Sequence, residues 1–305
     1  MENENEYSLP ETMAYYKLLS EFEKMVLVDK VFDEHTDRME IVKAIDKHIL
    51  LIPTVTAKTE NFWYKNLYRV RKINPENKYN PQDRNDTKYW SRISSFSMPK
   101  PEYCISNGRA NLKGNSVFYC SDDMLSAIHE MEVQPGEECF ISIWQSLVPR
   151  LSFNFMLPHG LNGDNKWSNV ASSLSGYVAN ETKERNDSQH QIYSRNFIAN
   201  LFCKEEKPYC VSSIIADFLL NDESDPIDFL LYPSVQTMHK YTNMAFNPVS
   251  ATKNLKLRKV LRYKVNAREG LNIKGDIMAI GVNINNEILW REVNDEDIIE
   301  LNKKR

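Results

Sequence analysis

The stretch NGRANLKGNSVFYCSDDMLSAIHEM, Asn107–Met131, contains the pattern that decides the fold. Its first two residues, Asn-Gly, form a turn signal, and the apolar run at 117–120 has the character of a strand. Ser121 then offers a helix N-cap, followed by two aspartates in the first turn, where the helix dipole favours negative charge. A second apolar run, CFISIWQ at 139–145, predicts another strand. The stretch therefore predicts a strand–helix–strand unit.

The flanking sequence extends this unit into a mixed α/β (α+β) fold, a central sheet with flanking helices. Apolar spacing predicts a helical N-terminal extension over residues 1–60 and a core over 61–255, interrupted by a polar surface insertion at about 158–186. Residues 256–305 are expected to form strands and a short helix packed on that core. Strands are expected at 66–72, 228–233 and 255–267, helices at 188–203 and 209–221, a polar loop at 74–87, and a C-terminal β-hairpin around Asn285-Asn286.

Composition excludes several classes of protein. The 305-residue chain has a net charge of −4, so no overall basic field draws it to nucleic acid or to a membrane surface. Five cysteines without a CxxC pair favour reduced thiols, and the acidic N-terminus is not a signal peptide. The longest aliphatic run, Ile49–Ile52, is far shorter than the ~20 residues that span a bilayer. We therefore expect a cytoplasmic protein.

Standard nucleotide and metal motifs are also missing from the sequence. There is no GxGxxG and no GxxxxGK[ST], so neither common phosphate-binding loop is present. His129-Glu130 begins like the zinc motif HExxH, but Val133 stands where the second histidine would be. No close group of cysteines and histidines suggests another metal site, so none is predicted.

Glu130 is the first candidate functional residue. At 100° per residue, the predicted helix carries an apolar stripe of Met124, Ala127, Ile128 and Met131, and Glu130 lies off it on the side of Ser126. A solvated glutamate would show the same pattern. Ordinary interpretations exist for the other candidates too: a strand position for Arg69, a surface position for Arg109, a core aromatic for Tyr119 and a turn residue for Ser234.

Three sequence blocks, taken in order, favour a functional interpretation of these residues over the ordinary ones. LYRVRK, NGRANLKGNSVFYCSDDMLSAIHE and FLLYPSVQTMHKYTNMAFNP resemble the signature blocks of the RES-domain family, which is named after an Arg, a Glu and a Ser. The resemblance covers about 65–250. The middle block is the most specific, because it matches the family spacing at Gly108, Arg109, Asn111, Gly114, Tyr119, Ala127 and Glu130. The MEVQPGEE that follows Glu130 departs from the family pattern, and the terminal extensions and the insertion lie outside it.

The resemblance implies an ADP-ribosyltransferase-like central sheet and NAD as substrate, with inorganic phosphate as a possible co-substrate and no cofactor. It assigns catalytic roles to Arg69, Glu130 and Ser234, and substrate-binding roles to Arg109, Asn111, Tyr119 and Asn243. These types of residue suit the chemistry. A guanidinium can bind pyrophosphate oxygens in a fork, and a carboxylate can stabilise an oxocarbenium-like transition state at the ribose. The tyrosine offers a flat surface to the nicotinamide end, and the serine a hydrogen bond.

Three functions are compatible with these residues. The first is an NAD-degrading bacterial toxin or defence effector, restrained by an antitoxin or another regulatory protein. The second is a protein ADP-ribosyltransferase that uses the same cleft, and the third is an inactive module that binds ADP-ribose-like ligands. Retention of Arg69, Glu130 and Ser234 together argues against the third, and the sequence does not separate the first two. We also predict that a terminal extension forms a homo-oligomer contact; packing on the chain's own core is the alternative.

Overall fold

The computed structural model describes residues 11–50, 52, 56–58, 66–73, 90–158, 160–173, 188–224, 226–294 and 297. The helices are α1 Thr12–Leu27, α2 Arg38–His48, α4 Met124–Glu130, α6 Ser188–Lys204, α7 Cys210–Leu220 and α8 Pro248–Asn254. The strands are β1 Thr56–Lys58, β2 Leu67–Lys72, β3 Phe118–Ser121, β4 Glu138–Ser146, β5 Ser152–Phe155, β6 Phe229–Pro233, β7 Thr242–Phe246, β8 Leu255–Glu269, β9 Asn272–Ile284 and β10 Glu287–Arg291. Short 3-10 turns lie at Ile93–Ser95, Pro101–Tyr103 and Val235–Thr237.

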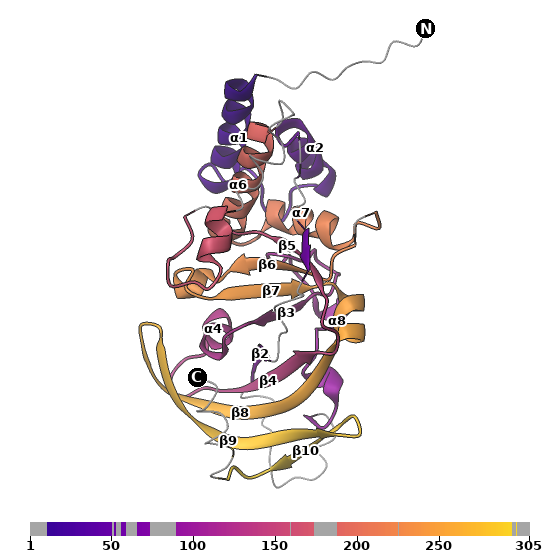
Figure 1. The fold of residues 1–305 in the computed structure, drawn as a ribbon, viewed down its shortest axis with the longest axis vertical. Helices are drawn as coiled ribbons and strands as arrows, with labels where there is room; N and C mark the ends of the chain where they lie inside the picture. Colours follow the sequence, from indigo (N-terminus) through magenta and orange to yellow (C-terminus); the bar gives the residue numbers. More distant parts are fainter. Residues whose placement is uncertain are drawn as a thin grey trace.

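All ten strands form one sheet, in the order β1-β5-β6-β7-β3-β2-β4-β8-β9-β10. The pair β5–β6 is parallel, and every other neighbouring pair is antiparallel. In Figure 1, helices α1, α2, α6 and α7 gather at one end of the molecule and the long hairpin β8–β9 lies at the other. The predicted mixed α/β class, with flanking helices and a C-terminal hairpin, is confirmed.

Alternation along β6 separates two apolar cores. Leu230 and Tyr232 pack into a cluster with the side chains of α1, α2, α6 and α7. Phe229 and Leu231 point the other way, into an aromatic cluster that includes Phe153, against which Phe229 stacks at 4.8 Å between ring centroids. Side chains that alternate in this way are expected of a strand buried on both faces. The helical face is the one that carries the candidate site.

The N-terminal extension packs on its own chain. The apolar stripe of α1 faces α6: Phe22 stacks on Phe197 at 5.5 Å, and the Tyr15 hydroxyl hydrogen-bonds Ser194. The extension is not helical to its end, because 56–58 forms β1 and pairs with β5. The run of β-branched residues in TVT, at 54–56, favours a strand there and explains the difference.

The C-terminal hairpin forms as predicted, and the start of its outer strand is paired with another segment. Asn285 and Asn286 have φ of 51° and 67°, the conformation that a two-residue turn between antiparallel strands requires. The backbone N–H of Ile288 then donates to the Ser91 carbonyl at 2.8 Å, so residues of the same chain pair with β10. Within one chain, the α1 stripe and part of the β10 edge are therefore in contact with other segments, and the homo-oligomer contact stays a prediction.

The insertion expected at 158–186 is not a purely surface segment. Trp167 is 2% exposed and packs edge-on against Phe153 and Phe155, and Ala171 is fully buried. Scattered apolar residues in a polar stretch carry no periodicity, which is why the sequence pattern missed this packing. The second half of the insertion, the predicted loop at 74–87 and most of the short C-terminal helix lie outside the described residues.

Across these ranges, none of the helices is both long enough and apolar enough to cross a bilayer.

Candidate functional site

Strand register builds the floor of a cavity. Tyr68 pairs with Ser121 across β2–β3, Ser121 with Asn243 across β3–β7, and Asn243 with Tyr232 across β7–β6. Directly paired residues share one face of a sheet, so the four side chains form one row. This row is the floor. The backbone ladders of β3, β7 and β6 set its position.

The cavity above the floor has a volume of about 250 Å3. Arg69, Arg109, Tyr119, Glu130 and Asn243, all predicted site residues, line it. Loops form its rim, which consists of the turn 107–111, Tyr209 between α6 and α7, and the loop 234–241. Segments far apart in the sequence thus converge on one pocket.

Glu130 is exposed at the last position of α4 and points into this cavity. Its Oε1 accepts hydrogen bonds from Ser234 Oγ at 2.6 Å and from Asn243 Nδ2 at 2.8 Å. Among the described residues nothing donates to Oε2, so that oxygen is available to a ligand. The floor and the rim each contribute one donor to the same carboxylate.

The helix that carries Glu130 differs in two details from the prediction. Asp123, not Ser121, is the N-cap, because its side chain accepts from Ser126 N at 3.0 Å while Ser121 still belongs to β3. The buried face contains Ser126 and His129 in addition to the predicted Ala127 and Ile128, whereas Met131 is 39% exposed. A seven-residue helix meets neighbours on several sides, so a single apolar stripe describes it poorly.

His129 holds this helix in place. Its Nδ1 accepts from Arg268 Nη2 at 2.6 Å, and its Nε2 lies 3.1 Å from the Leu271 carbonyl. An imidazole that accepts at one nitrogen and donates at the other is neutral. Burial and then the nearby Arg268 charge lower the pKa of His129, which keeps it in this form.

Ser234 lies beneath Glu130, not at the cavity surface. Its side chain is fully buried, and its hydroxyl donates to the carboxylate. The backbone around it closes a tight loop, in which Ser234 N donates to the Tyr241 carbonyl and His239 N donates to the Ser234 carbonyl. The geometry therefore assigns Ser234 to the support of Glu130, where direct contact with substrate was expected.

Arg69 occupies the gap where β2 and β3 diverge after a single paired position. Its Nη1 donates to the Tyr119 carbonyl at 3.2 Å and its Nε to the Ser97 carbonyl at 3.1 Å. Burial lowers the pKa of Arg69 to about 10, so the guanidinium stays charged at neutral pH. The guanidinium also lies 5.7 Å from the centre of the Phe118 ring, so two of its nitrogens and one of its faces are already used by the protein, and no free fork is left for a ligand.

Arg109 is engaged in a similar way on the opposite wall. Its Nη1 donates to the Glu205 carbonyl at 3.1 Å and approaches the Leu201 carbonyl at 3.5 Å, both near the C-terminus of α6. A cation is favoured there by the helix dipole. The guanidinium also lies 4.6 Å from the centre of the Tyr209 ring. Arg109 thus connects the helical layer to the turn 107–111. The sequence predicts that Arg69 or Arg109 supplies the fork for pyrophosphate, and for Arg109 these contacts would first have to open.

Tyr119 and Asn111 form the base of that turn. Tyr119 Oη donates to Asn111 Oδ1 at 2.9 Å and accepts from Ala110 N at 2.8 Å. Asn111 is buried and does not line the cavity, so its predicted substrate contact has no geometric support, while Tyr119 both lines the cavity and holds the turn. Gly108 leaves room for these contacts: a Cβ there would lie 2.3 Å from Asn111 Oδ1.

Tyr68, Tyr209, Tyr232 and Gln236 line the cavity but were not predicted. Tyr232 lies two residues before Ser234 in a predicted strand, so strand parity was the available signal for it, whereas Tyr68 directly precedes Arg69 and parity with Arg69 did not indicate it. Tyr209 has left-handed backbone with φ of 55°, which no local pattern indicates. In the described ranges no group of three or more His, Cys, Asp or Glu side chains could hold a metal ion.

Comparison with protein-family models, with curated proteins and with solved structures found no match to this chain.

Proposed function

We propose that this protein cleaves the nicotinamide–ribose bond of NAD. The observation that carries the proposal is the Glu130 carboxylate, held by two donors on Oε1 with Oε2 open to a cavity whose walls include Arg69 and several tyrosines. The resemblance of three sequence blocks to the RES-domain family supports the same reaction. So does the agreement between those blocks and the residues that meet at one cavity.

The chemistry needs a negative charge beside the ribose. As the bond from the ribose C1′ to the nicotinamide nitrogen breaks, its electron pair leaves with the ring and positive charge develops on the sugar. A preorganised carboxylate stabilises that charge without having to reorient, and Glu130 Oε2 is in a position to act in this way. Water or phosphate then bonds to C1′ and releases its proton to solvent.

The cavity would enclose only part of the dinucleotide. Its volume of about 250 Å3 is below the ~300–1,000 Å3 of pockets that enclose a whole drug-sized ligand. The nicotinamide riboside portion would lie among the tyrosines, with Arg69 as a positive charge in the cavity wall. The adenosine portion would extend past the rim. No metal or cofactor is required for this step.

Product analysis tests the proposal. Purified protein is incubated with NAD, with and without phosphate, and the products are identified by mass spectrometry. Nicotinamide with ADP-ribose indicates hydrolysis, and nicotinamide with ADP-ribose-1″-phosphate indicates phosphorolysis. Nicotinamide release only in the presence of a protein that gains ADP-ribose would favour the protein ADP-ribosyltransferase. If NAD remains intact in every arm, the proposed function is wrong.

An NAD-consuming enzyme would act as a toxin or defence effector and would need restraint by an antitoxin or another regulatory protein. Expression in a bacterial host should lower intracellular NAD before growth stops. The Arg69→Ala variant should be tolerated, because it removes the positive charge from the cavity wall. Growth arrest with normal NAD would instead point to a modified protein target.

A further inference from the structure

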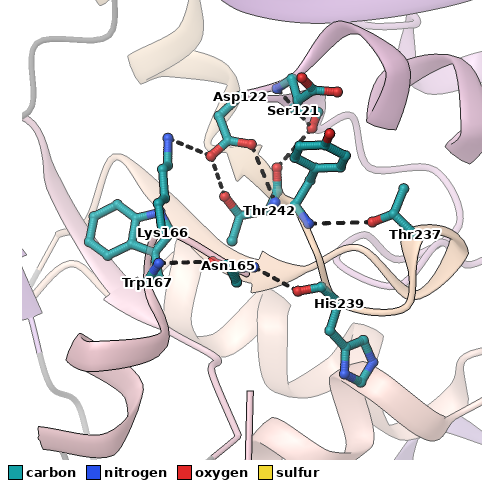
Figure 2. Close-up of polar contacts among 10 residues, drawn as sticks. Ser121, Asp122, Asn165, Lys166, Trp167, Thr237, His239 and Thr242 are labelled. Carbon is teal, nitrogen blue, oxygen red and sulfur yellow. Dashed lines mark hydrogen bonds and ion pairs between the residues drawn. The ribbon is translucent and has the colours of Figure 1, made fainter. Parts of the chain in front are cut away.

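The segment 162–167 makes polar contacts to two regions that adjoin the supports of Glu130. Figure 2 shows that Asn165 and Lys166, which are adjacent in the chain, contact different partners. Asn165 reaches the loop 234–241, which carries Ser234. Lys166 reaches Asp122, at the junction between β3 and α4. Asp122 in turn binds Thr242, which directly precedes Asn243, the other donor to Glu130.

The Asn165 side of this network is a short relay of hydrogen bonds. Asn165 Nδ2 donates to the His239 carbonyl at 2.8 Å (Figure 2). The backbone N–H of His239 donates to the Ser234 carbonyl at 2.9 Å, and the Ser234 hydroxyl donates to Glu130. Asn165 is 2% exposed, and its own Oδ1 is fixed by the backbone N–H of Trp167 at 2.9 Å. Its amide is therefore rigidly aimed at the loop.

The loop 234–241 has a backbone conformation that needs stabilising contacts from outside the loop. Met238 and His239 are consecutive residues with φ of 50° and 62°, a conformation that L-residues adopt at a cost unless their surroundings enforce it. A second amide from the same segment, Asn162 Nδ2, donates to the Met238 carbonyl at 3.1 Å. Both carbonyls of the left-handed pair thus accept a side-chain amide from 162–167.

The Lys166 side supports the floor. Lys166 Nζ pairs with Asp122 Oδ2 at 2.5 Å, and the same carboxylate accepts from Thr242 Oγ1 at 2.5 Å and from Thr242 N at 3.3 Å (Figure 2). Thr242 begins β7 and immediately precedes Asn243. The Asp122 side chain is 6% exposed whereas Lys166 is 54% exposed, so the bonds to Thr242 are the sheltered ones, and they fix the start of β7 against the residue before α4.

We propose that Asn165 is a positioning residue for the candidate site: through the loop 234–241 it holds the Ser234 hydroxyl against Glu130. The part of this proposal that concerns turnover rests on the proposed function; the part that concerns the loop does not. The segment 160–173 is then a support of the reaction centre, and its burial against Phe153 and Phe155 gives that support a fixed base.

The variant Asn165→Asp isolates the contact. It keeps an oxygen to accept from Trp167 N but replaces the donor to the His239 carbonyl by a second acceptor. Ser172→Ala is the matched control, since Ser172 is exposed on the same segment and, among the described residues, its hydroxyl donates to the Ser168 carbonyl alone. Hydrogen exchange by mass spectrometry and NAD turnover are measured on both variants and on the unaltered chain.

We expect amides of 235–241 to exchange at least about tenfold faster in Asn165→Asp and to be unchanged in Ser172→Ala. The kcat for NAD should fall about tenfold with KM nearly constant, because Glu130 loses part of its support while the cavity keeps its walls. In the Ser234→Ala background, Asn165→Asp should lower kcat little further, since both changes interrupt one relay.

Unchanged exchange at 235–241 overturns the proposal, as does an additive loss of kcat in the double variant, which indicates general loosening. If Asn165→Asp does not fold, Asn162→Asp, at a half-buried position, replaces it with the same expectations at a smaller, roughly twofold to fivefold, scale. If the unaltered chain does not cleave NAD, the proposed function fails, and hydrogen exchange alone decides whether Asn165 holds the loop.

Discussion

The floor of the cavity and its rim are held by different kinds of contact. The floor residues, such as Ser121 and Asn243, lie at paired positions of β3 and β7, so a ladder of backbone hydrogen bonds places them together. The rim depends on single side chains that bind backbone carbonyls, as Arg109 does at Glu205 and Asn165 at His239. A single substitution should therefore move the rim easily, whereas the floor should resist it.

Glu130 is the point where the two regions meet, and its charge is expected to matter most. Glu130→Gln keeps the size of the side chain but removes the charge that would stabilise the developing cation. Turnover of NAD should fall by ~10²–10³, the usual cost of one preorganised electrostatic group. NAD binding, followed by calorimetry, should survive better than turnover. Glu132→Gln, an exposed glutamate two residues further on, should remain fully active. Normal turnover by Glu130→Gln would make Glu130 an ordinary solvated residue.

Removing either donor to Glu130 compares the rim with the floor directly. Ser234→Ala and Asn243→Ala each delete one hydrogen bond to a carboxylate, worth about 1.5–3 kcal/mol, so kcat should fall roughly 10- to 100-fold in both. The melting temperature should fall further in Asn243→Ala than in Ser234→Ala, because Asn243 lies within the central strand β7 whereas Ser234 lies at the start of a loop. Equal melting temperatures would contradict the division into floor and rim.

The turn at Gly108 is the tightest point of the rim. Gly108→Ala would bring a Cβ to 2.3 Å from Asn111 Oδ1 and 2.8 Å from Tyr119 Oη, so the turn must shift. We expect a loss of about 1–3 kcal/mol in the free energy of unfolding, as for other overpacked sites. Gly163→Ala is the control, because nothing lies within 4 Å of a Cβ there. Urea denaturation measures both, and equal stability of the two variants would show that the turn adapts freely.

The smallest expected effect is a pH dependence at the rim. Burial, followed by the Arg109 charge, lowers the pKa of His239 below its usual value near 6.5. Below about pH 6.5 the unfolded chain therefore binds a proton before the folded chain does, and the free energy of unfolding declines as pH falls toward the lowered pKa. At neutral pH and above, this contribution to stability is fully present.

His239→Asn should make the decline with acidification shallower, because asparagine does not titrate and tolerates the left-handed backbone at this position. Denaturation between about pH 7.5 and 5 measures the slope. His129, whose pKa burial also lowers, accounts for part of the dependence that remains. His35→Asn, at an exposed position, serves as the control, and an identical slope in His239→Asn and His35→Asn would exclude the rim as the source.

Much of the secondary structure could be predicted from local pattern. Alternation in LYRVRK located β2, and the helices expected at 188–203 and 209–221 match α6 and α7 within a residue or two at each end. Burial was less predictable where it depends on distant partners. Trp167 and Ala171 lie in a polar stretch, and only the approach of Phe153 and Phe155 makes a core around them.

The sequence by itself determined the candidate residues of the site. Short sequence blocks indicated five residues that line one cavity in the structure: Arg69, Arg109, Tyr119, Glu130 and Asn243. Their contacts came from the tertiary structure alone. Ser234 and Asn243 meet on Glu130 Oε1 because β6, β7 and α4 are brought together by long-range pairing, which no local pattern encodes. Likewise, Arg69 and Arg109 donate hydrogen bonds to backbone carbonyls of segments that are distant in the sequence. Residue type and spacing follow from local chemistry; which groups satisfy one another is decided only when the chain is packed.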